Sequence, residues 1–119
     1  MSAIRALRRA IAVGACAAAL AGCLHADVRH LASDSFAGRN NNAPGGVAAR
    51  TWLVEQLQQV TVGPVAGQTG TAAYLQPFAQ GANVIGVIPG TQAPDEYVLI
   101  GGHYDHHGSC GNVGGDTIC

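Results

Sequence analysis

The chain has 119 residues, which allows at most one small domain with a modest hydrophobic core. Six arginines and seven acidic residues give a net charge of −1, so the chain lacks the basic surface that a nucleic-acid-binding protein needs. The sequence contains no internal repeat.

The first 22 residues have the pattern of a secretory signal peptide. Three arginines precede an apolar run at residues 10–21, which is too short to span a bilayer as a permanent helix. The run ends in Leu-Ala-Gly-Cys at Cys23, and this ending resembles the bacterial lipoprotein signal, in which the cysteine is lipidated and becomes the new amino terminus. A plain cleavable signal and an uncleaved anchor are the alternatives. We expect an exported protein, lipid-anchored at Cys23 to the membrane on the periplasmic side of the cell envelope.

Residues 39–46 are rich in turn formers and are predicted to be a loop. Arg39 at its start is expected to be solvated, although a contact with substrate or with another segment is the alternative. The next stretch, residues 46–60, is predicted to be an amphipathic helix, because its apolar residues fall on one stripe. That stripe consists of Ala49, Trp52, Leu53, Leu57 and Val60.

Most of the second half of the chain is predicted to form β-strands. Residues 71–80 carry β-type side chains around Pro77, which predicts an edge strand because proline cannot donate to a ladder. Further strands are predicted at residues 83–88 and 98–102, and the short turn between them suggests an antiparallel hairpin at a sheet edge. Residues 111–118 are glycine-rich and are predicted to be a loop.

The apolar stretch at residues 98–102 leads into the side chains best suited to chemistry. We expect a buried central strand whose carboxyl end presents His103 and Asp105 where ligands bind in open α/β sheets. Side chains alternate along a strand, so these two should point the same way and Tyr104 the opposite way. A neutral imidazole is a good zinc ligand, and a nearby carboxylate orients the ring or binds the metal as well. The alternative is that the histidines here are ordinary polar loop residues.

Two cysteines near the end of the chain flank the glycine-rich stretch. In an exported protein, Cys110 and Cys119 are expected to form a disulfide. The alternative is that their thiolates join His103 at a zinc ion, but no Cys-x-x-Cys spacing supports it.

The sequence resembles the co-catalytic zinc aminopeptidase family, which includes bacterial leucyl aminopeptidases and, more distantly, glutamate carboxypeptidases and glutaminyl cyclases. Asn-Val-Ile-Gly at residues 83–86 and His-Tyr-Asp-His at residues 103–106 carry the resemblance together. Asp-Ser-Phe-Ala-Gly-Arg at residues 34–39 also looks like the family's amino-terminal segment, and the resemblance covers about residues 31–108. It implies an α/β chain, the amino-terminal part of a three-layer α/β/α zinc exopeptidase fold, with an incomplete sheet.

The resemblance also implies a site with two zinc ions. In it His103 is a metal ligand and Asp105 orients that ligand. Asp116 lies near the expected bridging aspartate, but its surroundings do not match the family's Gly-Ala-Asp-Asp-Asn-like phrase. The general base and the remaining ligands match no residue, and Glu55, Asp95 and Glu96 fit none of these positions. We therefore expect residues 23–119 to be a truncated catalytic domain that is inactive alone.

Two functions remain open from the sequence. The first is a zinc-dependent metallopeptidase that removes amino-terminal residues from peptides outside the cytoplasm. In the mechanism that the resemblance implies, zinc polarises the scissile carbonyl and activates a water molecule. The second is a non-catalytic exported lipoprotein that serves as a scaffold or binds metal weakly.

Overall fold

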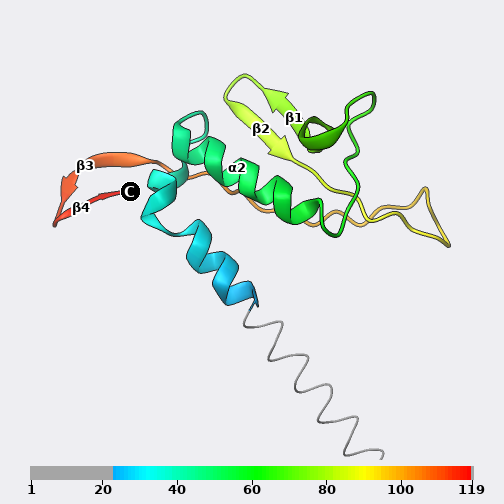
Figure 1. Ribbon diagram of the computed structural model, residues 1–119, viewed down its shortest axis with the longest axis horizontal. Helices are drawn as coiled ribbons and strands as arrows, with labels where there is room; N and C mark the ends of the chain where they lie inside the picture. The colour runs from blue at the N-terminus through cyan, green and yellow to red at the C-terminus, as the bar shows by residue number, and fades with distance from the viewer. Residues whose placement is uncertain (1–22, 119) are drawn as a thin grey trace, which may run out of the picture. The chain divides into compact units, whose positions relative to one another are not determined.

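The computed structural model describes residues 23–118, and the chain divides into two compact units at residues 1–33 and 34–119 (Figure 1). In the first unit, residues 23–31 are helical. Ser33 closes the end of this helix, because its N–H and its hydroxyl both donate to the His30 carbonyl oxygen, at 3.1 and 2.7 Å. The predicted leader, residues 1–22, lies outside the described residues. Within residues 23–118, no helix combines the length and the apolar character that crossing a membrane requires.

The second unit mixes helices with two small antiparallel sheets, each of two strands, so the prediction of a mixed α and β chain is confirmed. Strand β1 pairs with β2, and β3 pairs with β4. In chain order the elements are η1 (Asp34–Arg39), α2 (Pro44–Leu57), η2 (Gly70–Tyr74), β1 (Leu75–Phe78), β2 (Gly81–Val84), β3 (Ser109–Val113) and β4 (Asp116–Ile118).

Helix α2 begins and ends for local reasons. Pro44 occupies its first turn, where a missing backbone N–H costs nothing. Gly45 follows, and the Phe36 carbonyl oxygen lies so close to it that a side chain would clash. At the other end, the N–H and Oγ1 of Thr61 both donate to the Leu57 carbonyl oxygen, at 2.9 and 2.6 Å. The predicted helix is confirmed, although it starts at position 44 and ends at position 57.

The core of the second unit joins α2 to η2 and to the β1–β2 hairpin. Tyr74 is central to it, because its ring is buried while its hydroxyl donates to the Thr61 carbonyl oxygen at 2.8 Å. This bond satisfies the polar end of an otherwise apolar side chain. The buried cluster consists of Val54, Ala73 and Tyr74, with Leu57, Leu75 and Val84 packed against it.

The buried face of α2 differs in part from the predicted stripe. Ala49 is fully buried as expected, and Trp52 and Leu53 are partly buried. Val54 is not part of the predicted stripe, yet it is only 1% exposed, and Val60 is exposed because the helix has already ended. The reason is that η1, η2 and β2 all contact α2, which widens the buried face beyond a single stripe.

The β1–β2 hairpin confirms the predicted edge strand. Pro77 lies in β1 opposite Ala82, and β1 has a partner strand on one side only. The second predicted strand, at residues 83–88, is displaced, because β2 ends at position 84. Beyond it, Val87 exchanges two backbone hydrogen bonds of 2.9 Å with Val62, which ties the chain after β2 to the chain after α2.

The prediction of a buried central strand at residues 98–102 is wrong. This stretch has no strand, and Val98, Leu99 and Ile100 are each 92% exposed. A strand exists only where a neighbouring strand accepts and donates its ladder hydrogen bonds, and no described residue does so here. The predicted hairpin between residues 83–88 and 98–102 is absent from the described residues for the same reason.

The predicted loop at residues 111–118 is also wrong, because β3 and β4 form a hairpin there. Its turn consists of Gly114 and Gly115, whose φ angles are 64° and 97°. Two consecutive residues with positive φ are what a tight two-residue hairpin turn requires, and glycine adopts them without strain.

Candidate functional site

Residues 104–108, called the held segment below, lie against the residues at the end of η1. The His106 N–H donates to the Arg39 carbonyl oxygen at 3.0 Å, and the Gly108 N–H donates to the Gly38 carbonyl oxygen at 2.9 Å. Gly38 and Gly108 have φ angles of 68° and 85°, and a Cβ atom on Gly38 would lie 2.5–2.8 Å from the backbone of Gly108. The two backbones therefore approach as closely as they do because Gly38 has no side chain, while Gly108 adopts its positive φ without strain.

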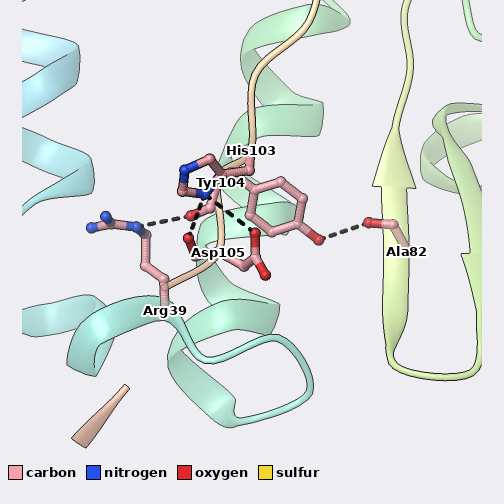
Figure 2. A network of polar contacts seen from close by, with 5 residues as sticks. All are labelled: Arg39, Ala82, His103, Tyr104 and Asp105. Carbon is pink, nitrogen blue, oxygen red and sulfur yellow. Dashed lines mark hydrogen bonds and ion pairs between the residues drawn. The ribbon is translucent and has the colours of Figure 1, made fainter. Parts of the chain in front are cut away.

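Side chains hold the same segment from two directions (Figure 2). The Arg39 Nε donates to the Tyr104 carbonyl oxygen at 2.9 Å, and the Asn40 Nδ2 donates to the His107 carbonyl oxygen at 3.0 Å. On the other side, the Tyr104 hydroxyl donates to the Ala82 carbonyl oxygen of β2 at 2.7 Å. The prediction that Arg39 is solvated is therefore wrong, since its side chain is partly buried and contacts another segment.

His103 and Asp105, the two residues selected from the sequence, contact each other. The His103 Nδ1 lies 3.5 Å from the Asp105 Oδ1 and 2.9 Å from the Asp105 carbonyl oxygen. A carbonyl oxygen only accepts hydrogen bonds, so we assign the proton of the neutral ring to Nδ1, which leaves the lone pair on Nε2. Figure 2 shows the two side chains meeting while Tyr104 extends toward Ala82. The His103 side chain is 81% exposed, so solvent screens its attraction to the carboxylate.

The other predicted site residue, Asp116, does not join this pair. It lies on β4, where its Oδ1 accepts a hydrogen bond from the Ile118 N–H at 2.9 Å. Across residues 23–118, no three His, Cys, Asp or Glu residues are grouped so that they could hold a metal ion. The rings of His106 and His107 contact each other edge to face at 5.1 Å between centroids.

The donor types fit zinc, but their number does not make a complete zinc site. An imidazole whose other nitrogen donates to an acidic residue is a common arrangement at zinc. A tight zinc site, however, uses three or four protein ligands, and the described residues bring together His103 and Asp105.

The structure describes two of the four cysteines, Cys23 and Cys110. Cys23, the predicted lipidation site, is exposed and is not in a disulfide. Cys110 is disulfide-bonded. Its predicted partner Cys119 lies outside the described residues, so the pairing stays a prediction.

A cavity of about 640 Å³ adjoins the pair and was not predicted from the sequence. Its wall combines apolar side chains with the backbone of two segments that are far apart in the sequence. The lining residues are Asn41, Leu57, Phe78, residues 82–86 and residues 99–105.

Two contributors to the site, Arg39 and Tyr104, were assigned no role from the sequence. Their contacts join residues that are 65 and 22 positions apart, and no local pattern indicates such pairs. Gly38 and Gly108 were the available sequence signal for this contact, because glycines at these positions permit the close approach of the two backbone segments.

Comparison of the chain with known protein families, with curated proteins and with solved structures finds no match. Evidence for the function therefore comes from the site and from the resemblance of the sequence phrases at residues 83–86 and 103–106, since a fold alone does not determine a function.

Proposed function

We propose that this chain contributes a histidine–aspartate pair to the zinc site of an exported, aminopeptidase-like hydrolase that acts on peptides. The observation that carries the proposal is the contact between the His103 Nδ1 and Asp105, which leaves Nε2 available to a metal. Asp105 offers both its carbonyl oxygen and its carboxylate to Nδ1, and either acceptor fixes the tautomer and the orientation of the ring.

The held segment supports this role because it fixes the chain next to the pair. Arg39 holds the carbonyl group of Tyr104, and Ala82 of β2 accepts the hydrogen bond from its hydroxyl. Tyr104 lies between His103 and Asp105 in the sequence, so both members of the pair extend from a backbone position with two fixed contacts. Positioning of this kind is what a metal ligand needs from the residues around it.

The cavity supports the choice of a peptide as substrate. Its volume exceeds that of an amino-acid side chain, and apolar residues such as Leu57, Phe78 and Val84 line it together with His103. A zinc ion held by His103 would supply Lewis-acid chemistry, polarising the peptide carbonyl and lowering the pKa of a water molecule. The remaining ligands and the general base have to come from outside the described residues, as two zinc ions require more groups than this pair.

A zinc titration tests the metal part of the proposal. The full chain should bind zinc weakly, and His103→Ala should remove the binding that calorimetry detects. Asp105→Asn keeps the carbonyl acceptor and loses the charge, so it should reduce the affinity by about tenfold or more. The matched control is the double variant His106→Ala/His107→Ala, which removes two neighbouring imidazoles and should leave the affinity unchanged. A His103→Ala chain that titrates like the parent would contradict the assignment.

Fractionation of cells tests the lipid anchor separately. Cys23→Ala should move the chain from the membrane fraction to the soluble fraction, because the acyl chains would have no attachment site. His25→Ala leaves the Leu-Ala-Gly-Cys signal intact and should stay with the membranes. If Cys23→Ala partitions as the parent does, the anchor is not at Cys23, and the loss of zinc binding in His103→Ala is still informative.

A further inference from the structure

Most of the polar side chains that line the cavity already interact with another residue. The polar lining residues are Asn41, Asn83, His103, Tyr104 and Asp105. His103 and Asp105 contact each other, and the Tyr104 hydroxyl donates to the backbone of β2. The Asn83 Nδ2 donates to the Gln76 Oε1 at 3.0 Å. Four of the five polar side chains are therefore paired.

Asn41 is the exception, because no hydrogen bond or ion pair among the described residues involves its side-chain amide. The side chain is partly buried, and in residues 23–118 every fully buried polar atom of a side chain has a hydrogen-bond partner. The amide atoms of Asn41 are therefore accessible, in a side chain that forms part of the cavity wall. The preceding Asn40 is used differently, since its Nδ2 donates to the His107 carbonyl oxygen of the held segment.

Two glycines fix the position of Asn41. A Cβ atom on Gly81, the first residue of β2, would lie 2.2 Å from the Asn41 Oδ1 and 3.0 Å from its Nδ2, so the amide packs closely against this glycine. A Cβ atom on Gly46 of α2 would lie 2.7 Å from the Asn41 carbonyl oxygen. Both the side chain and the backbone of Asn41 are thus placed by close contacts, which lowers the entropy that the amide would lose on binding a ligand.

An asparagine amide is complementary to the backbone of an extended peptide. Its oxygen accepts hydrogen bonds and its nitrogen donates them. In an extended chain the N–H and the carbonyl group of one residue point to the same side, so a single amide can bond to both. The cavity wall around Asn41 includes Leu57, Phe78 and Val84, which suit apolar side chains of such a peptide. None of the residues that line the cavity is a lysine or an arginine, so this wall does not favour an anionic ligand.

We propose that Asn41 is a peptide-binding residue of the cavity. Its Oδ1 accepts a hydrogen bond from a backbone N–H of the bound peptide, and its Nδ2 donates to the carbonyl oxygen of the same peptide residue. The cavity then prefers a peptide bond to an ester bond, because an ester has an oxygen where the peptide has its N–H. This role of Asn41 rests on the peptide substrate proposed above, but it does not require the zinc ion.

The preference for a peptide bond over an ester bond tests this role. The two probes are leucyl-leucine amide and its analogue in which an ester oxygen replaces the linking N–H. Each is titrated into the isotope-labelled full chain in the presence of a chelator, and binding is followed by NMR. The peptide should bind about fivefold more tightly than the ester, which is the effect of one hydrogen bond. The side-chain amide signals of Asn41 should shift on addition of the peptide, a result that needs no variant.

Two variants separate hydrogen bonding from packing. Asn41→Leu keeps the size of the side chain but has no polar atom, so the ratio of the two affinities should fall to about one. Asn41→Asp keeps an acceptor and loses the donor, so both affinities should fall while the peptide stays preferred. Damage to the cavity alone would weaken both probes and leave the ratio unchanged. The matched control is Asn83→Leu, which removes an amide already bonded to Gln76 and should keep the ratio at about fivefold.

An unchanged ratio in Asn41→Leu, or a ratio near one in the parent chain, would overturn the role of Asn41. A parent chain that binds neither probe at millimolar concentration, or a ratio lost equally in Asn83→Leu, would overturn it as well. The zinc titration of His103→Ala is a separate result, because the chelator removes metal from the probe experiment. If that titration fails while the ratio depends on Asn41, the metal site is lost and peptide binding is retained. The reverse results would retain the metal site and exclude Asn41.

Discussion

The exposed segment (residues 97–102) and the held segment (residues 104–108) are neighbours in the chain, yet their environments are the reverse of what their hydrophobicity predicts. The apolar one is in solvent without hydrogen bonds, while the polar one is fixed by Gly38, Arg39, Asn40 and Ala82. Hydrophobicity measures how much a segment gains from being covered, but its position depends on which backbone groups are available to it.

Gly108→Ala should disrupt the held segment most. Its φ of 85° disfavours any residue with a side chain, and the new Cβ would lie 2.6 Å from the Cβ of Asn40. Strain and clash together should lower the free energy of unfolding by about 3 kcal/mol. Urea denaturation would measure it. Gly101→Ala, in the exposed segment, is the matched control, because it has open space around it and should change the stability by less than about 0.5 kcal/mol.

Arg39→Met should have the next largest effect. The methionine retains most of the aliphatic stem but loses the Nε donor, so the Tyr104 carbonyl oxygen loses a charged partner. We expect a loss of about 1.5 kcal/mol and faster hydrogen exchange at the His106 amide. Arg50→Met removes an arginine of similar burial from α2 and should cost less than about 0.5 kcal/mol. Equal losses in both variants would contradict the role of Arg39.

Tyr104→Phe removes a single oxygen and should have a smaller effect. The hydroxyl donates to the Ala82 carbonyl oxygen, so its loss should lower the stability by about 1 kcal/mol. Tyr97→Phe makes the same chemical change in the exposed segment, where the hydroxyl faces solvent, and should be neutral. The difference between the two denaturation midpoints measures the bond directly, and a neutral Tyr104→Phe would show that β2 does not hold this segment.

Val98→Thr should have the smallest effect. A residue with 92% exposure has no packing to lose, so we expect a change of less than about 0.5 kcal/mol. Val54→Thr in the core serves as the positive control that the assay detects a buried hydroxyl. A large loss from Val98→Thr would mean that the exposed segment is packed against other residues.

Local signals in the sequence predicted the elements that depend on nearby residues. The apolar periodicity of residues 46–60 predicts helix α2, and β1 is predicted around Pro77. The start of the helix was not predicted, because residues 39–46 have the composition of a loop, whereas α2 already begins at Pro44. The β3–β4 hairpin was missed although its signal was present, since Gly114-Gly115 is a typical two-residue turn. High glycine content indicates a loop, whereas the strand residues on both sides decide whether such a turn closes a hairpin.

Partners that are distant in the sequence could not be predicted. The prediction of a buried strand at residues 98–102 failed, because a strand-like composition does not say which strand lies alongside. For the candidate site, the spacing of His103 and Asp105 predicted that the two side chains would meet, and they do. The hydrogen bonds from Arg39 and Asn40 were not predictable, because their acceptors lie 65 and 67 positions further along the chain.

These long separations have a consequence for the order in which the molecule folds. Helix α2 and the two hairpins close through contacts between near neighbours, whereas the held segment closes a loop of more than sixty residues onto Arg39 and Asn40. Long loops lose more conformational entropy before any contact compensates for it, so distant contacts form late. We therefore expect the surroundings of His103 and Asp105 to assemble after α2 and β1–β2. The pair would then reach its final geometry only in chains whose other contacts are already complete.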